Sequence, residues 1–100
     1  MDEDKYRFKL FISGMSVKSV RALENFKEIA DEHLNGNHEV EIIDVGKDRA
    51  KAVEYEIFAV PTLIKFSPEP RRIILGDLSE KEKVLKLLDI VQLKNETRST

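Results

Sequence analysis

The chain lacks cysteine and tryptophan altogether, and it has few glycines and prolines among its 100 residues. Without cysteine there are no disulfide bonds, no thiolate metal sites and no cysteine-based redox chemistry. No apolar run approaches the roughly 20 residues of a membrane-spanning helix, and the first residues, MDEDK, lack the apolar core of a signal peptide. We therefore predict a cytoplasmic protein with no cofactor, no metal and no membrane contact.

Charge of both signs is abundant but balanced. Charged residues make up 36% of the chain and hydrophobic residues 41%, with a formal net charge of −2. This composition is typical of a globular protein with a charged exterior, and the missing basic excess argues against nucleic-acid binding. The length fits one domain over residues 1–100, which we expect to be folded from about residue 6 to residue 93.

The first half of the chain has the pattern of a strand, a helix and a second strand. Apolar and basic residues alternate over Tyr6–Ile12, which predicts a strand covered on both sides at Phe11. Ser16 can cap a helix that ends at the Asn-Gly-Asn sequence of residues 35–37. Its apolar stripe consists of Val17, Val20, Leu23, Phe26, Ile29, Ala30 and Leu34. A strand over Glu39–Val45, with Ile43 covered from behind, completes a βαβ unit, so the two strands should be parallel.

The second half is organised around residues 57–79, which hold all three prolines. Two apolar runs, Thr62–Phe66 and Ile73–Leu75, flank a Pro-x-Pro turn and predict an antiparallel strand pair. Before them, Asp48 can cap a short helix through Tyr55, with Ala52 and Val53 facing inward. After them, a capping box begins a last helix. The box consists of Ser79 and Glu82, and the apolar residues of that helix are Val84, Leu85, Leu87, Leu88 and Val91.

The predicted fold class is therefore α/β, in the thioredoxin-like order β-α-β-α-β-β-α. An apolar residue, Pro61, Thr62 and then a strand also resemble the thioredoxin superfamily, in which a cis-proline lies beside a redox cysteine pair. Cysteine is absent here, so the scaffold is expected without that chemistry. We interpret His33 and His38 as surface residues, because a metal site needs further ligands at defined spacing. A nucleophile at Ser13 or Ser16 would need an adjacent base, so we predict that the protein is not an enzyme.

Several segments together carry a more specific resemblance. They are SVRAL at 19–23, IDV at 43–45, Ala59 with PTL at 61–63, RRII at 71–74, and GDLS at 76–79 followed by EKVL at 82–85. This ordered set, from about Tyr6 to Val91, resembles the KaiB family of circadian clock proteins. The resemblance implies a non-enzymatic protein that binds KaiC, a hexameric double-ring ATPase.

The resemblance also implies where the partner binds. In the family the second helix and nearby residues dock on the ATPase ring. The corresponding positions are Lys47, Asp48, Ala52 and Glu56, with Arg21, Lys65 and Arg72 as supporting charges that we expect to be exposed. Glu41 stands where clock KaiB proteins carry a basic residue that helps to dock KaiA. This charge reversal argues against KaiA as a partner.

KaiB proteins are metamorphic, and the resemblance implies the same here. The alternative resting fold has the order β-α-β-β-α-α-β and is dimeric or tetrameric, whereas the KaiC-binding form is thioredoxin-like. Candidate fold-switch residues are Pro61, Pro68, Pro70, Leu87 and Asp89, since X-Pro isomerisation is slow and Leu87 replaces a glycine common in clock KaiB proteins. Two alternatives stay open: a KaiB-like sensor module of a SasA-type kinase, and a cysteine-free thioredoxin-like binding or chaperone protein.

Overall fold

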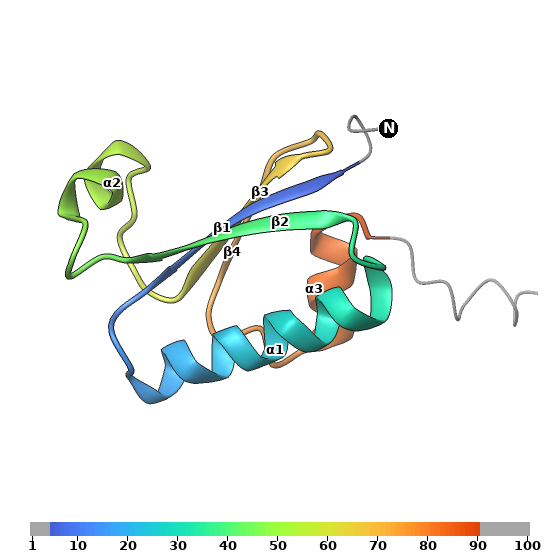
Figure 1. Cartoon of the computed structure of the whole chain (residues 1–100), viewed down its shortest axis with the longest axis horizontal. Coiled ribbons are helices and arrows are strands. Elements are labelled where there is room, and N and C mark those ends of the chain that lie inside the picture. The colour runs from blue at the N-terminus through green and yellow to red at the C-terminus, as the bar shows by residue number, and fades with distance from the viewer. Residues whose placement is uncertain (1–4, 91–100) are drawn as a thin grey trace, which may run out of the picture.

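The computed structural model describes residues 5–90 of the chain. The elements are β1 (Tyr6–Ile12), α1 (Val17–His33), β2 (His38–Asp44), α2 (Arg49–Glu54), β3 (Thr62–Ser67), β4 (Arg72–Leu75) and α3 (Lys81–Leu87). This order confirms the predicted β-α-β-α-β-β-α arrangement (Figure 1). The prediction that Val91 packs on the last helix lies outside the described residues.

The four strands form one sheet in the order β2-β1-β3-β4. As predicted, β2 runs parallel to β1, and β3 and β4 form an antiparallel pair, with β3 also antiparallel to β1. The central strands are the most apolar, because a strand paired on both sides is also the one most covered by other elements. The two edge strands, β2 and β4, leave one side of their backbone unpaired within the sheet.

Helices α1 and α3 cover one face of the sheet and bury the main core (Figure 1). Most of the predicted stripe of α1 lies in that core or packs against it. Val17 and Leu87 are exceptions, since both are exposed although they were predicted to be buried. Each lies in a terminal turn of its helix.

A second, smaller cluster lies on the opposite face, beneath the end of α2. Phe11, Ile43 and Ile64 form it, which confirms that Phe11 and Ile43 are covered from behind. Tyr55 closes the cluster with its ring centroid 5.8 Å from that of Phe11. Val53, predicted to face inward, is 76% exposed. The prediction is wrong because the segment packs on the sheet through Tyr55 and Ile57, which leaves Val53 on the outer side of α2.

Three of the four predicted helix ends are confirmed. Ser16 accepts a hydrogen bond from the Ser19 N–H, and Asp48 accepts one from the Lys51 N–H, so both predicted caps are confirmed. At the end of α1, Asn35 and Gly36 adopt the predicted left-handed conformation, with φ of 53° and 75°. The predicted capping box at Ser79 is wrong: α3 begins one residue later, after Glu80, which makes no side-chain cap bond.

The cause of the shifted helix start is the turn that precedes it. The Ser79 N–H donates to the Asp77 carboxylate at 3.1 Å, so Ser79 belongs to that turn. Leu78, at φ 64°, is buried in the core by the same turn.

The two histidines are not surface residues, which corrects the prediction. Both are half-buried, and their Nδ1 atoms are buried without a hydrogen-bond partner. The His38 ring packs edge-on against Phe26, with a centroid distance of 5.9 Å. Within residues 5–90, no group of three or more His, Asp or Glu side chains could hold a metal ion. In the same range, no helix is long and apolar enough to cross a membrane.

Candidate protein-interaction surface

The most exposed apolar side chains of the described chain include one on α2 and one shortly after it. Phe58 is 94% exposed and Val53 76% exposed. They border a groove of about 480 Å³ whose lining also includes Val45, Arg49, Ala52, Ile57 and Val60. Exposed apolar groups that gather around a groove mark interaction sites. We call the surface formed by Lys47, Asp48, Ala52, Val53, Glu56 and Phe58 the α2 surface.

Local hydrogen bonds explain how the chain presents this surface. The Asp44 side chain accepts a bond from the Gly46 N–H at 2.9 Å, which turns the chain sharply after β2. At the other end of α2, Glu56 adopts a left-handed conformation with φ 56°. The Ile57 N–H donates a hydrogen bond to the Ala52 carbonyl at 2.9 Å. This closure directs Ile57 towards the sheet and leaves the next residue, Phe58, in solvent.

The loop after Phe58 is held in place before β3 begins. The Thr62 hydroxyl donates to the Ala59 carbonyl at 2.6 Å, and the Val60–Pro61 peptide bond is cis. Pro61 and Thr62 are both buried, so this end of the loop is anchored in the fold.

Four of the predicted partner-binding residues lie together on the α2 surface. Lys47 and Glu56 are exposed, whereas Asp48 and Ala52 are half-buried. The Asp48 carboxylate already accepts the Lys51 N–H at 3.2 Å as the helix cap. The sequence analysis missed Phe58, although an apolar residue in a non-periodic stretch before a proline was an available signal.

The other three predicted residues lie elsewhere, and Lys65 is buried, not exposed. Lys65 is 0% exposed, and its Nζ donates to the Leu88 carbonyl at 2.7 Å. Its neighbour Asp89 lies 3.9 Å away and accepts a bond of 2.8 Å from the Arg72 Nε. We call Lys65, Arg72, Leu88 and Asp89 the Lys65 cluster. Arg21 lies apart from it, exposed on α1.

The Lys65 cluster has a structural role in this fold. Burial lowers the pKa of Lys65, and the hydrogen bond from Arg72 lowers the pKa of Asp89. Asp89 also adopts a left-handed conformation, with φ 60°, directly after the last turn of α3. The cluster therefore joins the end of α3 to β3 and β4, and it unites the predicted fold-switch residue Asp89 with two predicted partner-binding residues. Of the remaining fold-switch candidates, Pro68 and Pro70 lie in the β3–β4 turn, and Leu87 ends α3.

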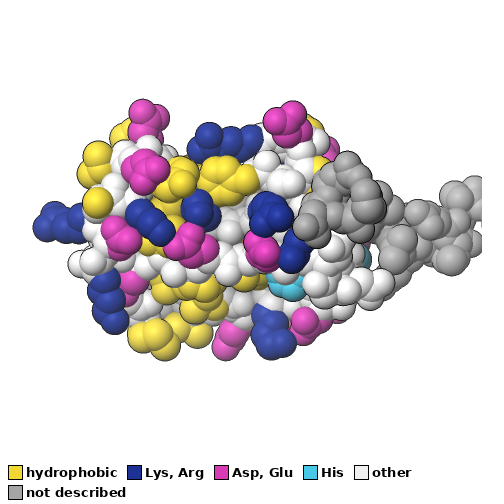
Figure 2. Space-filling model, turned by 45° about the horizontal axis from the view of Figure 1, so that its top comes forward, with side chains coloured by type: hydrophobic (Ala, Val, Ile, Leu, Met, Phe, Trp, Pro, Cys, Tyr) yellow, Lys and Arg dark blue, Asp and Glu magenta, His cyan; other side chains and the backbone are white. Residues whose placement is uncertain are grey.

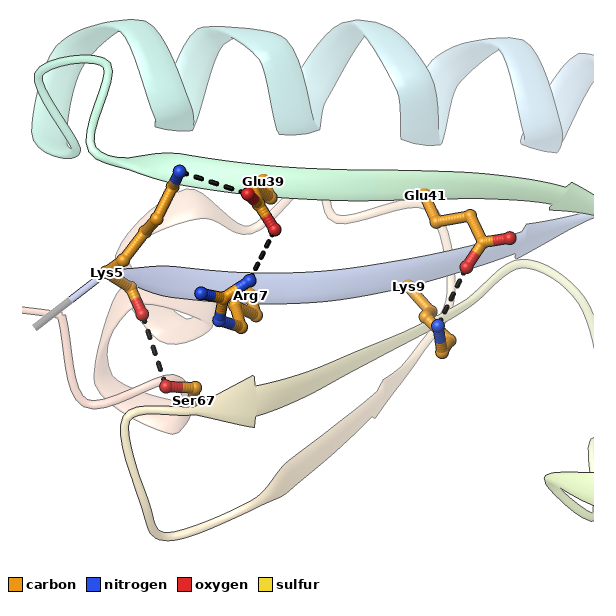
Figure 3. Close-up of polar contacts among 6 residues, drawn as sticks. All are labelled: Lys5, Arg7, Lys9, Glu39, Glu41 and Ser67. Atoms are coloured by element: carbon orange, nitrogen blue, oxygen red, sulfur yellow. Dashed lines mark hydrogen bonds and ion pairs between the residues drawn. The ribbon is translucent and has the colours of Figure 1, made fainter. Parts of the chain in front are cut away.

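The open face of the sheet beside the α2 surface is charged. Figure 3 shows Lys5 and Arg7 paired with Glu39, and Lys9 paired with Glu41, across β1 and β2. Lys51 of α2 donates to the other Glu41 oxygen at 2.6 Å. In Figure 2 basic and acidic side chains alternate in a band across this face, with hydrophobic patches on either side. Each of these two carboxylates meets two cations, so the paired groups leave this part of the band net positive.

The two hydrogen bonds from Lys51 and Lys9 lower the pKa of Glu41 to about 2. The folded pKa is below the ordinary value of 4.5, so this contribution to stability is present above that value and is lost as the pH falls towards 2. We expect an NMR titration of the Glu41 carboxyl group to give a midpoint near the lower value. Replacing Lys51 by methionine should raise the midpoint, whereas the same change at the remote Lys27 should not. A wild-type midpoint near 4.5 would contradict the paired geometry.

Comparisons with known proteins agree on family and fold. The family model described as KaiB domain matches residues 9–90. Circadian clock protein KaiB3 of Synechocystis sp. is 45% identical over 91 residues, which cover 91% of this chain and 89% of that protein. Circadian clock oscillator protein KaiB of Trichodesmium erythraeum is 45% identical over 86 residues, covering 86% and 83%.

Solved structures extend the likeness to the thioredoxin fold. The N-terminal domain of Synechococcus elongatus SasA matches with a TM-score of 0.69 at 19% identity, covering 86% of this chain and 85% of that one. The thioredoxin Deadhead of Drosophila melanogaster also matches with a TM-score of 0.69, at 18% identity and with 88% and 82% covered. At such identities the match concerns the fold alone, and it confirms the predicted thioredoxin-like class.

Proposed function

The chain belongs to the KaiB family of circadian clock proteins, and from that premise we propose that it is a non-enzymatic regulator that binds a KaiC-type hexameric ATPase through the α2 surface. The observation that carries the proposal is the exposure of Val53 and Phe58, which lie within and directly after the segment to which the family resemblance assigns partner contacts.

Physical chemistry supports the α2 surface as the docking site. Burying a side chain such as Phe58 or Val53 at an interface contributes about 1.5–3 kcal/mol each. Aromatic residues in the centre of an interface commonly dominate its binding energy. Lys47 and Glu56 stand exposed beside the groove, and exposed charges at a rim mainly set orientation and association rate. The surface thus combines an apolar anchor with a polar rim.

A size-exclusion experiment tests this function directly. The chain is run alone, with a KaiC-type hexamer, and with that hexamer loaded with ADP or with a non-hydrolysable ATP analogue. We expect co-elution with the hexamer in at least one nucleotide state. If the hexamer remains intact and the chain elutes separately in every state, the ATPase is not its partner.

We further propose that the thioredoxin-like fold exchanges with an oligomeric resting fold, as the family resemblance implies. The Lys65 cluster is a set of contacts that this exchange would break, because it joins α3 to β3 and β4 in the thioredoxin-like fold. The βαβ unit of β1, α1 and β2 would be common to both folds. A sensor module of the SasA type, which shares the fold, is the second candidate and would keep a single fold.

Replacing Leu87 by glycine is predicted to raise the population of the resting fold. Leu87 is exposed, so the main effect is the loss of helix propensity, roughly 0.8 kcal/mol, which corresponds to about a fourfold change in the ratio of the two folds. Two sets of amide signals from Ala50 onward, with one set before it, would report that ratio by NMR.

The matched control for this prediction is glycine at Lys27, which lies exposed on α1. This change destabilises a helix that both folds contain, so the ratio of the two signal sets should stay as in the wild type. One signal set, unchanged by concentration or by either substitution, would favour the sensor module over a fold-switching protein.

KaiA is not part of the proposal. Glu41 replaces the basic residue expected at the KaiA-docking position, and both of its oxygens are engaged by Lys9 and Lys51. A partner that requires a cation there would meet a carboxylate instead, which is unfavourable at an interface.

A further inference from the structure

The ion pairs on the open face of the sheet leave an excess of positive charge, although the whole chain has a net charge of −2. Each of the two carboxylates of β2, Glu39 and Glu41, is shared by two cations, and a further cation lies directly before β4. The cations of this face are Lys5, Arg7, Lys9, Lys51 and Arg71. A local excess of one charge attracts ions of the other sign from solution.

Arg71 is the cation of this face that has no carboxylate partner. It is exposed, and it forms no ion pair within residues 5–90, although Glu56 lines a neighbouring pocket together with it. Its guanidinium lies over the Phe66 ring, with the Cζ atom 5.1 Å from the ring centroid. Stacking on a ring orients a guanidinium group without neutralising it, so its N–H groups can donate to an anion.

A second arginine lies on the other side of Phe66. The register of β1, β3 and β4 places Phe66 between Arg7 and Arg71 across the sheet. Neighbouring strands are about 4.8 Å apart, so the backbones of the two arginines are separated by roughly 10 Å, which two long side chains can span. Figure 3 shows Arg7 bonded to Glu39, a contact made by the Nη1 atom. The other two nitrogens of Arg7 have no printed role in that contact, and they can donate to a ligand.

A hollow of about 410 Å³ adjoins Arg7, and its lining includes Lys9, Tyr55 and Phe66. This volume lies within the range of small-molecule sites. The Lys9 Nζ atom lies 5.6 Å from the Tyr55 ring centroid and 5.5 Å from that of Phe66. The two aromatic rings therefore hold a third cation at the hollow, and they offer a surface on which a flat ring could pack.

We propose that this face binds a small molecule with two linked phosphate groups, namely inorganic pyrophosphate or a nucleoside diphosphate. Arginine suits phosphate because its planar fork donates two parallel hydrogen bonds to phosphate oxygens. Arg7 and Arg71 each hold one phosphate group, and Lys9 adds a positive charge between them and the hollow. In a nucleoside diphosphate, the base lies in the hollow against Tyr55.

Isothermal titration calorimetry of the full chain with pyrophosphate, ADP, adenosine and citrate tests the proposal. We expect pyrophosphate and ADP to bind, and citrate, an anion without phosphate, to bind at least about tenfold more weakly. Equal affinities for pyrophosphate and ADP support recognition of the phosphates alone, whereas tighter binding of ADP supports a base in the hollow. Adenosine that binds as tightly as ADP, or citrate as tightly as pyrophosphate, would overturn the proposal.

Substitutions make the test specific. Arg7→Gln combined with Arg71→Gln should weaken pyrophosphate binding at least about tenfold, because both charge-assisted contacts are lost. Lys18→Gln combined with Lys27→Gln is the control, since it removes the same charge from exposed positions on α1, at the opposite face of the sheet. This control should bind like the wild type. Equal affinities of the two double variants would contradict a site at the arginines.

A substitution with the opposite expected effect excludes a merely structural role of the arginines. Glu39→Gln removes the carboxylate that competes for Arg7, so pyrophosphate should bind about threefold more tightly or better. A Glu39 variant that binds more weakly than the wild type would show that the ion pair itself is needed, and the proposal would fail.

NMR separates binding on this face from a change of fold. Pyrophosphate should progressively shift the Tyr55 and Arg71 amide signals of the thioredoxin-like form, at any protein concentration. A change only in the relative intensities of two signal sets would mean that the anion alters the ratio of two folds without occupying this face, which would overturn the proposal. No hexamer is present in these experiments, so their outcome is independent of whether the α2 surface binds an ATPase.

Discussion

Replacing Lys65 by glutamate is expected to lower the free energy of unfolding by at least about 3 kcal/mol, the range found when a buried charged group loses its partner. The lysine is fully buried and donates to the Leu88 carbonyl. A glutamate would place a carboxylate against that carbonyl and near Asp89. Urea denaturation followed by circular dichroism measures the effect.

Two further substitutions show whether burial or charge is responsible. Methionine at Lys65 keeps the apolar stem but leaves the Leu88 carbonyl unpaired, so we expect a loss of about 1–3 kcal/mol. Alanine at Arg72, whose ion pair with Asp89 is half exposed, should cost only about 0–1 kcal/mol. Equal urea midpoints for wild type and the glutamate variant would mean that Lys65 is not buried in solution.

Lys65 also predicts a dependence of stability on pH. Burial lowers its pKa in the folded state below the ordinary value of 10.5. Between the folded and unfolded pKa values the unfolded chain binds more protons, so this group makes stability rise with pH through that window. The rise should vanish in the methionine variant, which has no titratable group there.

Replacing Phe58 by aspartate is expected to weaken capture of a KaiC-type hexamer at least about thirtyfold, as for a central aromatic anchor worth about 2 kcal/mol or more. The side chain is 94% exposed, so stability should stay within about 0.5 kcal/mol of the wild type. Pull-down or interferometry with immobilised hexamer measures the affinity.

The control for Phe58 is lysine at Ile42, another partly exposed apolar residue. It lies on β2 beside α1, on the sheet face opposite the α2 side. Its lysine variant should bind the hexamer as well as the wild type does. Unchanged binding by the Phe58 variant would move the interface away from the α2 surface, whereas equal losses in both variants would indicate a general defect.

Local pattern predicted the strands and most caps, because alternation and side-chain capping are properties of neighbouring residues. The burial of Lys65 depends on tertiary packing, so it could not be predicted from local pattern. Strand β3 is covered on both faces, and its one lysine is enclosed by the end of α3. A lysine inside an otherwise apolar run was the signal for this. The start of α3 was mispredicted because Leu78 adopts a left-handed conformation in the turn before the helix. A leucine gives no sequence signal for that conformation, whereas a glycine would.

The candidate surface was only partly predictable for a similar reason. The family resemblance placed four residues on one segment, and the structure has them together. Which side of α2 faces solvent depends on Tyr55 and Ile57, which pack on Phe11, Ile43 and Ile64 from distant strands. With only six residues in α2, no apolar period could reveal that side, so Val53 was assigned inward and Phe58 was overlooked.

The sparse anchoring of α2 has a consequence for how strongly any ligand can bind it. None of its six residues is buried, and Lys51 fastens it to the sheet through Glu41. A segment held this way opens at a free energy well below that of global unfolding. The apparent affinity of a ligand for α2 is therefore reduced in proportion to the fraction of molecules in which α2 is packed on the sheet. A ligand that binds only this packed state raises that fraction.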